Sequence, residues 1–293
     1  MNQVILNSRV EKPAYFDMAG RLHWGAGCGR GFRIGDRAAA YIFLLDWRQR
    51  NPSRKLVVLD DMNYGECQSA RGLDAAWLFR TIADEVWDLD PKDKVDFFPL
   101  GEPLYTDSLW HYWYHLRHYR ASQLVPRICP RAESIITWEN NHTSKRPYVT
   151  VQPLFDASYN IHRNIDPRVW YEVIIYFAQQ GFDVVVLGLP DVLCHLKVKA
   201  IHQLPDCVFL YPTTSIQFSM AAVNGAYLHV GGETGLTIWS SIFRVPTIGV
   251  FVPVKSVWAD VAPISFGSPV AVVPPDPIVV QKTFENLKGL YLV

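Results

Sequence analysis

The sequence lacks several features that would place it in a special class of protein. Its five cysteines are scattered, and none has CxxC spacing, so neither a disulfide framework nor a zinc site is predicted. It has no apolar run of about 18 residues that could cross a membrane, and its N-terminus has no signal-peptide pattern. We therefore expect a cytoplasmic protein without a transmembrane segment.

An excess of charge of one sign is also absent. The chain of 293 residues carries 28 basic and 28 acidic side chains, so bulk attraction to nucleic acid or to an anionic membrane is not predicted. Internal repeats and low-complexity tracts are lacking as well. In contrast, 49% of the residues are hydrophobic, which predicts a sizeable core. The length suits one large domain or two of ordinary size.

A polar stretch near the middle of the chain is the best candidate for a linker. It reads "ENNHTSKRPY" (139–148), contains a proline and has no apolar period. We place the domain boundary there, which gives domains at 1–142 and 143–293.

Apolar runs typical of buried strands alternate with helical patterns in the second half. The strand-like runs are "YVTVQP", "FDVVVLG", "CVFLYP", "AYLHVG" and "TIGVF". The helical segments are 166–181, 214–225, the stretch between "GGETG" and "TIGVF", and 276–289. The first half is less regular. Its strand-like runs are "KLVVLD", "EVWDLD", "KVDFF" and "SIITW", its helical patterns lie at 37–50, 72–83 and 105–124, and residues 1–20 give no clear prediction. Alternation predicts an α/β protein with parallel sheets covered on both faces, here as two domains facing across a cleft.

One stretch of the second half carries a candidate binding site. It reads "LHVGGETGLTIWSSIFRVPTIGVF" (228–251), in the order strand, glycine turn, helix, strand. Ligands of open α/β sheets lie beyond the carboxyl ends of strands, where a helix N-terminus offers unpaired N–H groups to a phosphate. Gly231 and Gly232 would let the backbone approach a ligand, and Thr234 could donate its hydroxyl. Glu233 would suit sugar or ribose hydroxyls, or a metal; an ordinary turn capped by Thr234 or Glu233 is the alternative.

A second glycine-rich stretch lies in the first half. It reads "GRGFRIGDRAAAYIFLLDWRQRNPSRKLVVLDD" and places Asp36 directly before a predicted helix, which is followed by a strand. In the mouth of the first sheet, Asp36 would be positioned as a general base facing a donor bound by the other domain. A helix cap is the simpler interpretation of the same residue.

The two stretches together resemble the signatures of glycosyltransferase family 9. "RIGD" with its helix and "KLVVLD" is similar to the N-terminal signature of these heptosyltransferases of lipopolysaccharide core synthesis, and "VGGETGLTIWSSIFRVPTIGVFVP" is similar to their C-terminal signature. The segment 148–188 is similar to the start of their nucleotide-binding domain. The resemblance implies the GT-B fold, with two Rossmann-like domains, and an inverting transfer of sugar from a nucleotide-diphosphate sugar to a hydroxyl of a glycan or lipopolysaccharide type.

The resemblance also implies roles for particular residues. Asp36 falls on the catalytic base, Glu233 on the acid of the glycine motif, and Thr234–Leu236, which includes Gly235, on the diphosphate-binding turn. Arg163, with His162 as second choice, would neutralise charge on the departing diphosphate, although Arg163 could also be a plain surface residue. No metal and no cofactor is expected.

The sequence departs from the family pattern at several places. The family often has a histidine where this chain has Ile238, and a glycine where it has Val252. The first 20 residues have no counterpart that we can place. These departures speak against a heptose donor and a lipopolysaccharide acceptor more than they speak against glycosyl transfer.

Acceptor binding is assigned to the first half, at Arg33, Trp113 and Arg117. The last two lie in a stretch, residues 109–132, that is rich in arginine, histidine and aromatic residues and has no acid before Glu133. Such a stretch can hold a glycan or nucleic acid by stacking and charge, or it can be an ordinary amphipathic helix.

Three alternative functions stay open at this stage. One is a viral-type transferase that glycosylates DNA bases, although the zero net charge speaks against a DNA acceptor. Another is a protein of the same fold that binds a nucleotide or glycan without turnover. A dehydrogenase interpretation of "GAGCGRG" (25–31) is weak, because no clean strand precedes it.

Overall fold

The chain divides into two compact units, Met1–Tyr112 and Trp113–Val293. The computed structural model describes residues 14–17, 38, 41, 44–45, 47–60, 79–88, 102–103, 129–153, 163–188, 204–212, 215–252 and 268–291. Among these residues, no helix is long and apolar enough to cross a membrane. Each unit is described by itself below.

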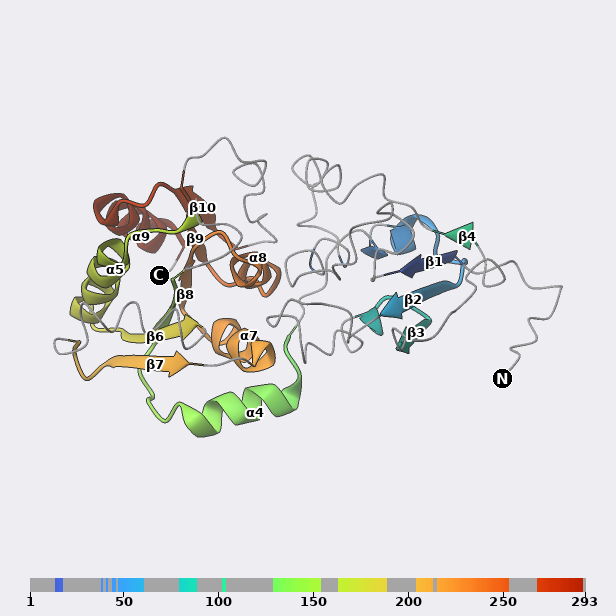
Figure 1. The fold of residues 1–293 in the computed structure, drawn as a ribbon, viewed down its shortest axis with the longest axis horizontal. Helices are drawn as coiled ribbons and strands as arrows, with labels where there is room; N and C mark the ends of the chain where they lie inside the picture. Colours follow the sequence, from blue (N-terminus) through green and yellow to red (C-terminus); the bar gives the residue numbers. More distant parts are fainter. Residues whose placement is uncertain are drawn as a thin grey trace. The chain divides into compact units, whose positions relative to one another are not determined.

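The first unit contains a parallel sheet in the order β3-β2-β1-β4. Its strands are β1 (Ala14–Asp17), β2 (Leu56–Asp60), β3 (Glu85–Asp88) and β4 (Glu102–Pro103). The predicted strands at 55–60 and 85–90 are confirmed. β1 lies between β2 and β4 (Figure 1) and falls in the N-terminal segment, for which no clear prediction was made; β4 was not predicted either.

A helix precedes β2, as the sequence predicts. Residues 38, 41, 44, 45 and 47–50 are helical, and the apolar side chains among them, including Ala38, Tyr41 and Leu44, are buried at helical spacing. Tyr41 packs against Phe79, with 6.3 Å between the ring centroids. The predicted helix at 105–124 and the predicted strand "KVDFF" lie outside the described residues.

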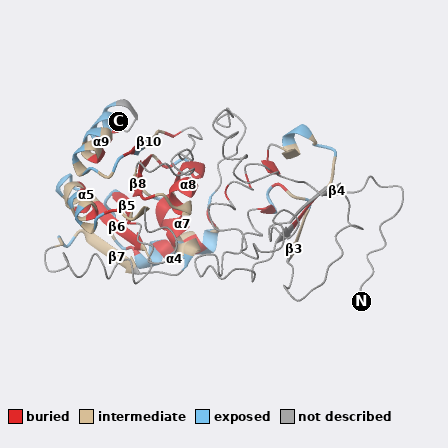
Figure 2. Cartoon of the chain, turned by 45° about the horizontal axis from the view of Figure 1, so that its top comes forward, coloured by how far each residue is buried: buried red, intermediate tan, exposed pale blue. Residues whose placement is uncertain are grey.

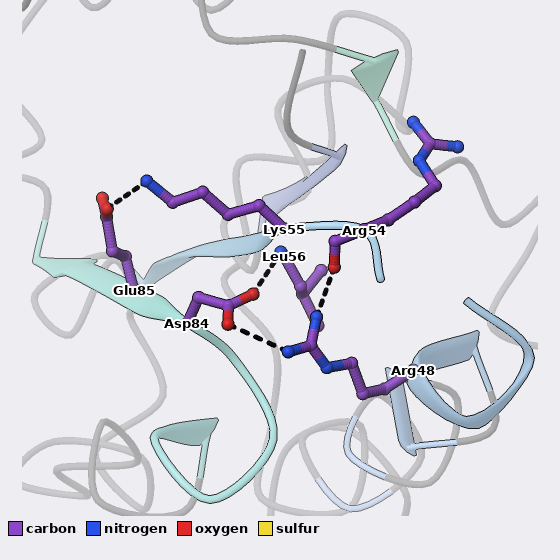
Figure 3. A network of polar contacts seen from close by, with 6 residues as sticks. All are labelled: Arg48, Arg54, Lys55, Leu56, Asp84 and Glu85. Carbon is purple, nitrogen blue, oxygen red and sulfur yellow. Dashed lines mark hydrogen bonds and ion pairs between the residues drawn. The ribbon is translucent and has the colours of Figure 1, made fainter. Parts of the chain in front are cut away.

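Polar contacts tie the end of this helix to the starts of two strands (Figure 3). Arg48 Nη2 donates to Asp84 Oδ1 over 2.9 Å, while Leu56 N donates to Asp84 Oδ2 over 2.8 Å. Arg48 Nη1 also donates to the carbonyl of Arg54, and Lys55 forms an ion pair with Glu85. The hydrogen bond from Leu56 N to the Asp84 carboxylate ties the start of β2 to the residue that precedes β3, and it thereby helps to fix the register of the two strands.

The second unit contains a six-stranded parallel sheet in the order β10-β9-β8-β5-β6-β7. Numbered within the unit, this is the strand order of the Rossmann fold, 3-2-1-4-5-6, viewed from the other side. The strands are β5 (Tyr148–Gln152), β6 (Asp183–Gly188), β7 (Val208–Pro212), β8 (Leu228–Gly231), β9 (Thr247–Val250) and β10 (Val270–Val273). The five strands predicted for this half are confirmed, whereas β10 was not predicted.

Helices cover both faces of this sheet (Figure 1). On one side lie α5 (Pro167–Gln179) and α9 (Pro277–Tyr291), and on the other lie α4 (Ala132–Asn141), α7 (Ile216–Asn224) and α8 (Gly235–Ile242). Figure 2 shows the buried residues gathered on the central strands and on α7 and α8. The core joins apolar residues of the strands to Trp170, Phe177 and Phe284 of α5 and α9.

The ends of α5 follow the predicted capping pattern. The Asp166 carboxylate accepts a hydrogen bond from Arg168 N over 2.9 Å, and Pro167 is the first helical residue. Gly181 follows the helix with a φ of 86°, a left-handed conformation that glycine adopts without steric cost. The predicted start and stop of this helix are therefore confirmed.

The prediction of a strand at "SIITW" was wrong, because these residues belong to α4. The β-branched run of Ile135, Ile136 and Thr137 favours a strand on local propensity. However, Ser134 and Trp138 lie four residues apart on one helical face, and both are buried there. Trp138 packs edge-on against Phe218 of α7, with 5.3 Å between the ring centroids. Tertiary packing therefore outweighs local propensity in this segment.

The contacts of α4 also bear on where the chain divides. Besides the packing of Trp138, Ser134 Oγ donates to Gln217 Oε1 of α7 over 3.4 Å, so α4 packs within the second unit. The residues of α4 were predicted to belong to the first domain, 1–142, whereas the compact units meet at 112/113. The domain boundary itself stays a prediction.

Candidate functional site

The candidate site lies where the strand order of the second sheet reverses. β5 and β8 are neighbours, but the chain proceeds from β5 toward β6 and β7, and from β8 toward β9 and β10. Their carboxyl ends meet at Gln152 and Gly231, which are paired in the sheet. A crevice forms at such a switch point because the two following connections leave in opposite directions, and ligands of doubly wound sheets bind there.

The glycine turn after β8 is held against the end of β5. Gly232 N donates to the carbonyl of Gln152 over 3.1 Å, and Thr234 N donates to the carbonyl of Gly232 over 2.7 Å. The hydroxyl of Thr234 donates to Gln152 Oε1 over 2.6 Å. Three hydrogen bonds thus fix the turn, and the Thr234 hydroxyl, expected to face a ligand, is directed to Gln152.

Thr234 is also the N-cap of α8. Its side-chain oxygen accepts a hydrogen bond from Thr237 N over 3.3 Å, which satisfies one donor of the first helical turn. The N–H groups of Gly235 and Leu236 come before it in the same turn and have no partner within the helix. These two donors, with the positive end of the helix dipole, form a small site for an anion.

Gly231 is required by packing inside the unit. A Cβ at this position would come within 3.0 Å of Thr237 Oγ1 and of His229 Nε2. From the sequence, Gly231 was expected to let the backbone approach a ligand, but the close side chains of Thr237 and His229 already explain a glycine here.

His229 lies at the centre of a buried polar network behind the turn. The side chain has no exposed surface, and Nδ1 lies 3.0 Å from Thr150 Oγ1 while Nε2 lies 3.4 Å from Thr237 Oγ1. Thr237 Oγ1 donates to the carbonyl of Gly232 over 2.7 Å, so Nε2 must be the donor toward Thr237. Nδ1 is then the acceptor from Thr150. Burial lowers the pKa of His229 to about 3, so the ring is neutral.

This network was not predicted from the sequence. His229 stands inside an apolar strand pattern, where an isolated histidine indicates nothing more than packing. The available signal was the alternation of the strand, which places His229 on the same face as Gly231. Thr150 and Thr237 come from other elements, and only the fold brings them together.

The fold brings together two of the predicted site residues, Arg163 and Glu233. Arg163 lies shortly before α5, and its Nε is 3.6 Å from Glu233 Oε2; the side chains are 11% and 10% exposed. Burial raises the pKa of Glu233 to about 7, and the neighbouring Arg163 guanidinium opposes this rise. Arg163 is therefore not a plain surface residue, and it places a cation beside the glycine turn.

Five other predicted site residues cannot be placed. Asp36, Arg33, Trp113, Arg117 and His162 lie outside the described residues.

The two positions that depart from the family pattern are described. Ile238 is buried in α8, and Val252 packs against the core after β9. Both side chains therefore serve the packing of the second unit.

Comparison with known proteins supports the architecture. No protein-family model matches the sequence, and neither does any curated protein. Solved structures do match the fold. A glycosyl transferase family 9 protein from Veillonella parvula gives a TM-score of 0.59 at 14% identity, covering 95% of this chain and 93% of that one. E. coli ADP-heptose lps heptosyltransferase II gives 0.61 at 11% identity, covering 94% and 98%.

E. coli heptosyltransferase WaaC, solved with ADP, gives a TM-score of 0.52 at 14% identity, covering 94% of this chain and 99% of that one. At these identities the likeness establishes the fold. The predicted α/β class is confirmed, and the chain has the GT-B fold, with a Rossmann-like parallel sheet in each unit.

Proposed function

We propose that this protein is a glycosyltransferase that moves a sugar from a nucleotide-diphosphate sugar to a hydroxyl acceptor. The observation that carries the proposal is the pairing of an anion site at the start of α8 with the cation Arg163 at the switch point of a Rossmann-like sheet. The fold gives independent support, since solved proteins of the same architecture include an E. coli heptosyltransferase with ADP.

The donor diphosphate would lie against the first turn of α8. The N–H groups of Gly235 and Leu236 would donate to its oxygens, and Arg163 would offset the negative charge that develops as the diphosphate leaves. Thr234 would act by holding the turn in place, because its hydroxyl is engaged with Gln152. Glu233, with Gly231 and Gly232, would border the sugar or ribose part of the donor.

Transfer would proceed with inversion at the anomeric carbon. Asp36 would remove the proton of the acceptor hydroxyl, whose oxygen then attacks the anomeric carbon as the bond to the diphosphate breaks. Arg33, Trp113 and Arg117 would bind the acceptor, for which we propose a glycan of lipopolysaccharide type. The reaction as written needs no metal and no cofactor.

A thermal-shift screen tests donor binding. The screen would compare ADP, UDP, GDP, CMP and dTDP with the corresponding sugar nucleotides, each at a concentration well above the expected Kd. A ligand at a hundred times its Kd adds about 2.7 kcal/mol to the free energy of unfolding, which is readily measured. We expect one nucleotide class to stabilise the protein, and Arg163→Met to weaken that effect more than Arg168→Met, a change at an exposed position of α5. A flat screen would contradict the donor site.

Asp36→Asn distinguishes an enzyme from a protein that only binds the donor. If Asp36 is the base, the variant keeps the donor-induced thermal shift and loses sugar transfer, measured as release of the nucleoside diphosphate in the presence of acceptor glycans. Equal transfer rates in wild type and variant would refute the assignment of the base.

A further inference from the structure

The carboxyl group of Glu233 lies in an unusual setting for a residue beside a phosphate site. It directly precedes the N-cap of α8, and nine-tenths of its side chain is buried. Among the described residues, Oε1 has no hydrogen-bond partner. Oε2 lies 3.6 Å from Arg163 Nε, which is longer than a charge-assisted hydrogen bond. One oxygen is thus buried without compensation, and the other is only loosely paired.

This setting favours the neutral acid. Burial raises the pKa of Glu233 to about 7, and Arg163 is the described charge that acts against it. The neighbouring elements offer no further described charge: β8 contributes the neutral His229, β5 ends in Gln152, and the first turn of α8 has no charged residue. A small change in local charge will therefore shift the proton occupancy of Glu233 near neutral pH.

We propose that Glu233 takes up a proton from solvent when the diphosphate of the donor binds at the start of α8, so that donor binding strengthens as the pH falls. The inference rests on the proposed function, because both concern the same turn. The bound phosphates repel the Glu233 carboxylate and also draw Arg163 away from it. Both effects favour the protonated group, whose hydroxyl can donate to a phosphate oxygen. The proton comes from solvent, and no bond of the donor breaks in this step.

Titration calorimetry on the full chain measures the proton directly. ADP-glucose, UDP-glucose and GDP-mannose serve as probes, because their phosphates are diesters that stay fully ionised near neutral pH and exchange no proton themselves. Binding enthalpies in HEPES and in Tris differ by the number of protons taken up times the difference in buffer ionisation enthalpy. We expect uptake of about half a proton at pH 7 and nearly one at pH 8, with affinity falling up to about tenfold per pH unit above pH 7.

Glu233→Gln provides the matched test of the residue. The amide keeps the shape of the protonated acid but cannot titrate, so the variant should bind with no proton uptake and with an affinity that does not change between pH 6 and pH 8. Glu172→Gln makes the same chemical change at an exposed position of α5 and should behave as wild type. Thermal unfolding of each variant verifies that it is folded.

The outcomes separate this inference from the proposed function. Uptake that is present in wild type and lost in Glu233→Gln supports the inference. Donor binding without proton uptake, or with uptake unchanged in Glu233→Gln, overturns the inference and leaves the proposed function intact. Failure of every sugar nucleotide to bind would overturn both.

Discussion

The buried side chain of His229 stabilises the glycine turn, although His229 lies in β8 and not in the turn. Its neutral ring joins Thr150 of β5 to Thr237 of α8, and Thr237 in turn holds the carbonyl of Gly232. The turn that forms the candidate site is thus linked through one imidazole to the strand beside it. Because the ring is fully buried, its protonation would leave a charge without solvent inside the sheet.

We expect His229→Leu to lower the free energy of unfolding by about 1–3 kcal/mol at pH 7, because the Thr150 and Thr237 hydroxyls each lose a buried partner. The variant should also change the pH dependence. In wild type the folded ring stays neutral down to a pKa of about 3, whereas the unfolded ring protonates below about 6.5. Wild type therefore loses stability relative to the variant as the pH falls from about 6.5 toward 3, by up to about 1.4 kcal/mol per unit.

Urea unfolding of wild type and variant at pH 7, 6 and 5 measures this difference. Comparing the two proteins at each pH cancels the opposing contribution of Glu233. The pKa of Glu233 is raised in the folded state, so this residue stabilises the fold at a pH below the ordinary pKa of glutamate. The contribution is lost as the pH rises through about 7. Parallel pH profiles for wild type and His229→Leu would show that His229 is not a buried neutral group.

At the scale of elements, the junction of β8 and α8 is packed so closely that one methyl group should disturb it. Gly231→Ala would drive a Cβ against Thr237 and His229, which we expect to destabilise the fold by about 1–3 kcal/mol. Gly289→Ala in α9 is the control, because a Cβ there meets nothing within 4 Å. It should stabilise the helix by about 0.5–1 kcal/mol. Equal effects of the two substitutions in chemical denaturation would contradict the packing at Gly231.

Elements whose local pattern agrees with their packing could be predicted from the sequence. The strands β5, β6 and β8 are mainly apolar runs whose residues are buried on both faces, and α5 has clear start and stop residues. α4 could not be predicted, since its β-branched run contradicts a helix that is stabilised by distant aromatic side chains. The edge strand β10 lies in a proline-rich stretch that masks its pattern.

The same distinction applies to the candidate site. The glycine turn could be placed from its motif, because the residues concerned follow one another in the chain. Glu233 was noted within the glycine motif, whereas Arg163 was reached only through family resemblance. Their contact was not predicted, since about 70 residues separate the two and no local pattern connects them. The network around His229 needed three elements in their final positions.

At the scale of the whole molecule, the stability of two fragments tests where the second half begins. A fragment of residues 113–293 contains α4, whereas a fragment of residues 143–293 lacks it and uncovers Phe218 and Tyr211, which Trp138 covers in the full chain. Loss of a buried tryptophan alone costs about 3–5 kcal/mol. We therefore expect the shorter fragment to unfold at a clearly lower urea concentration, if it folds at all. Equal midpoints would favour the boundary at residue 142.

The hydrogen bonds described around the glycine turn have a further consequence for engineering. Gln152, Arg163, Glu233 and Thr234 all belong to the unit that begins at Trp113, and so does the supporting histidine. The described residues of the proposed donor site therefore all lie in the second unit. Chimaeras that exchange the first 112 residues for those of another protein of this architecture would replace Arg33 and Asp36. They would keep Trp113 and Arg117, and we expect them to retain the nucleotide preference of this protein.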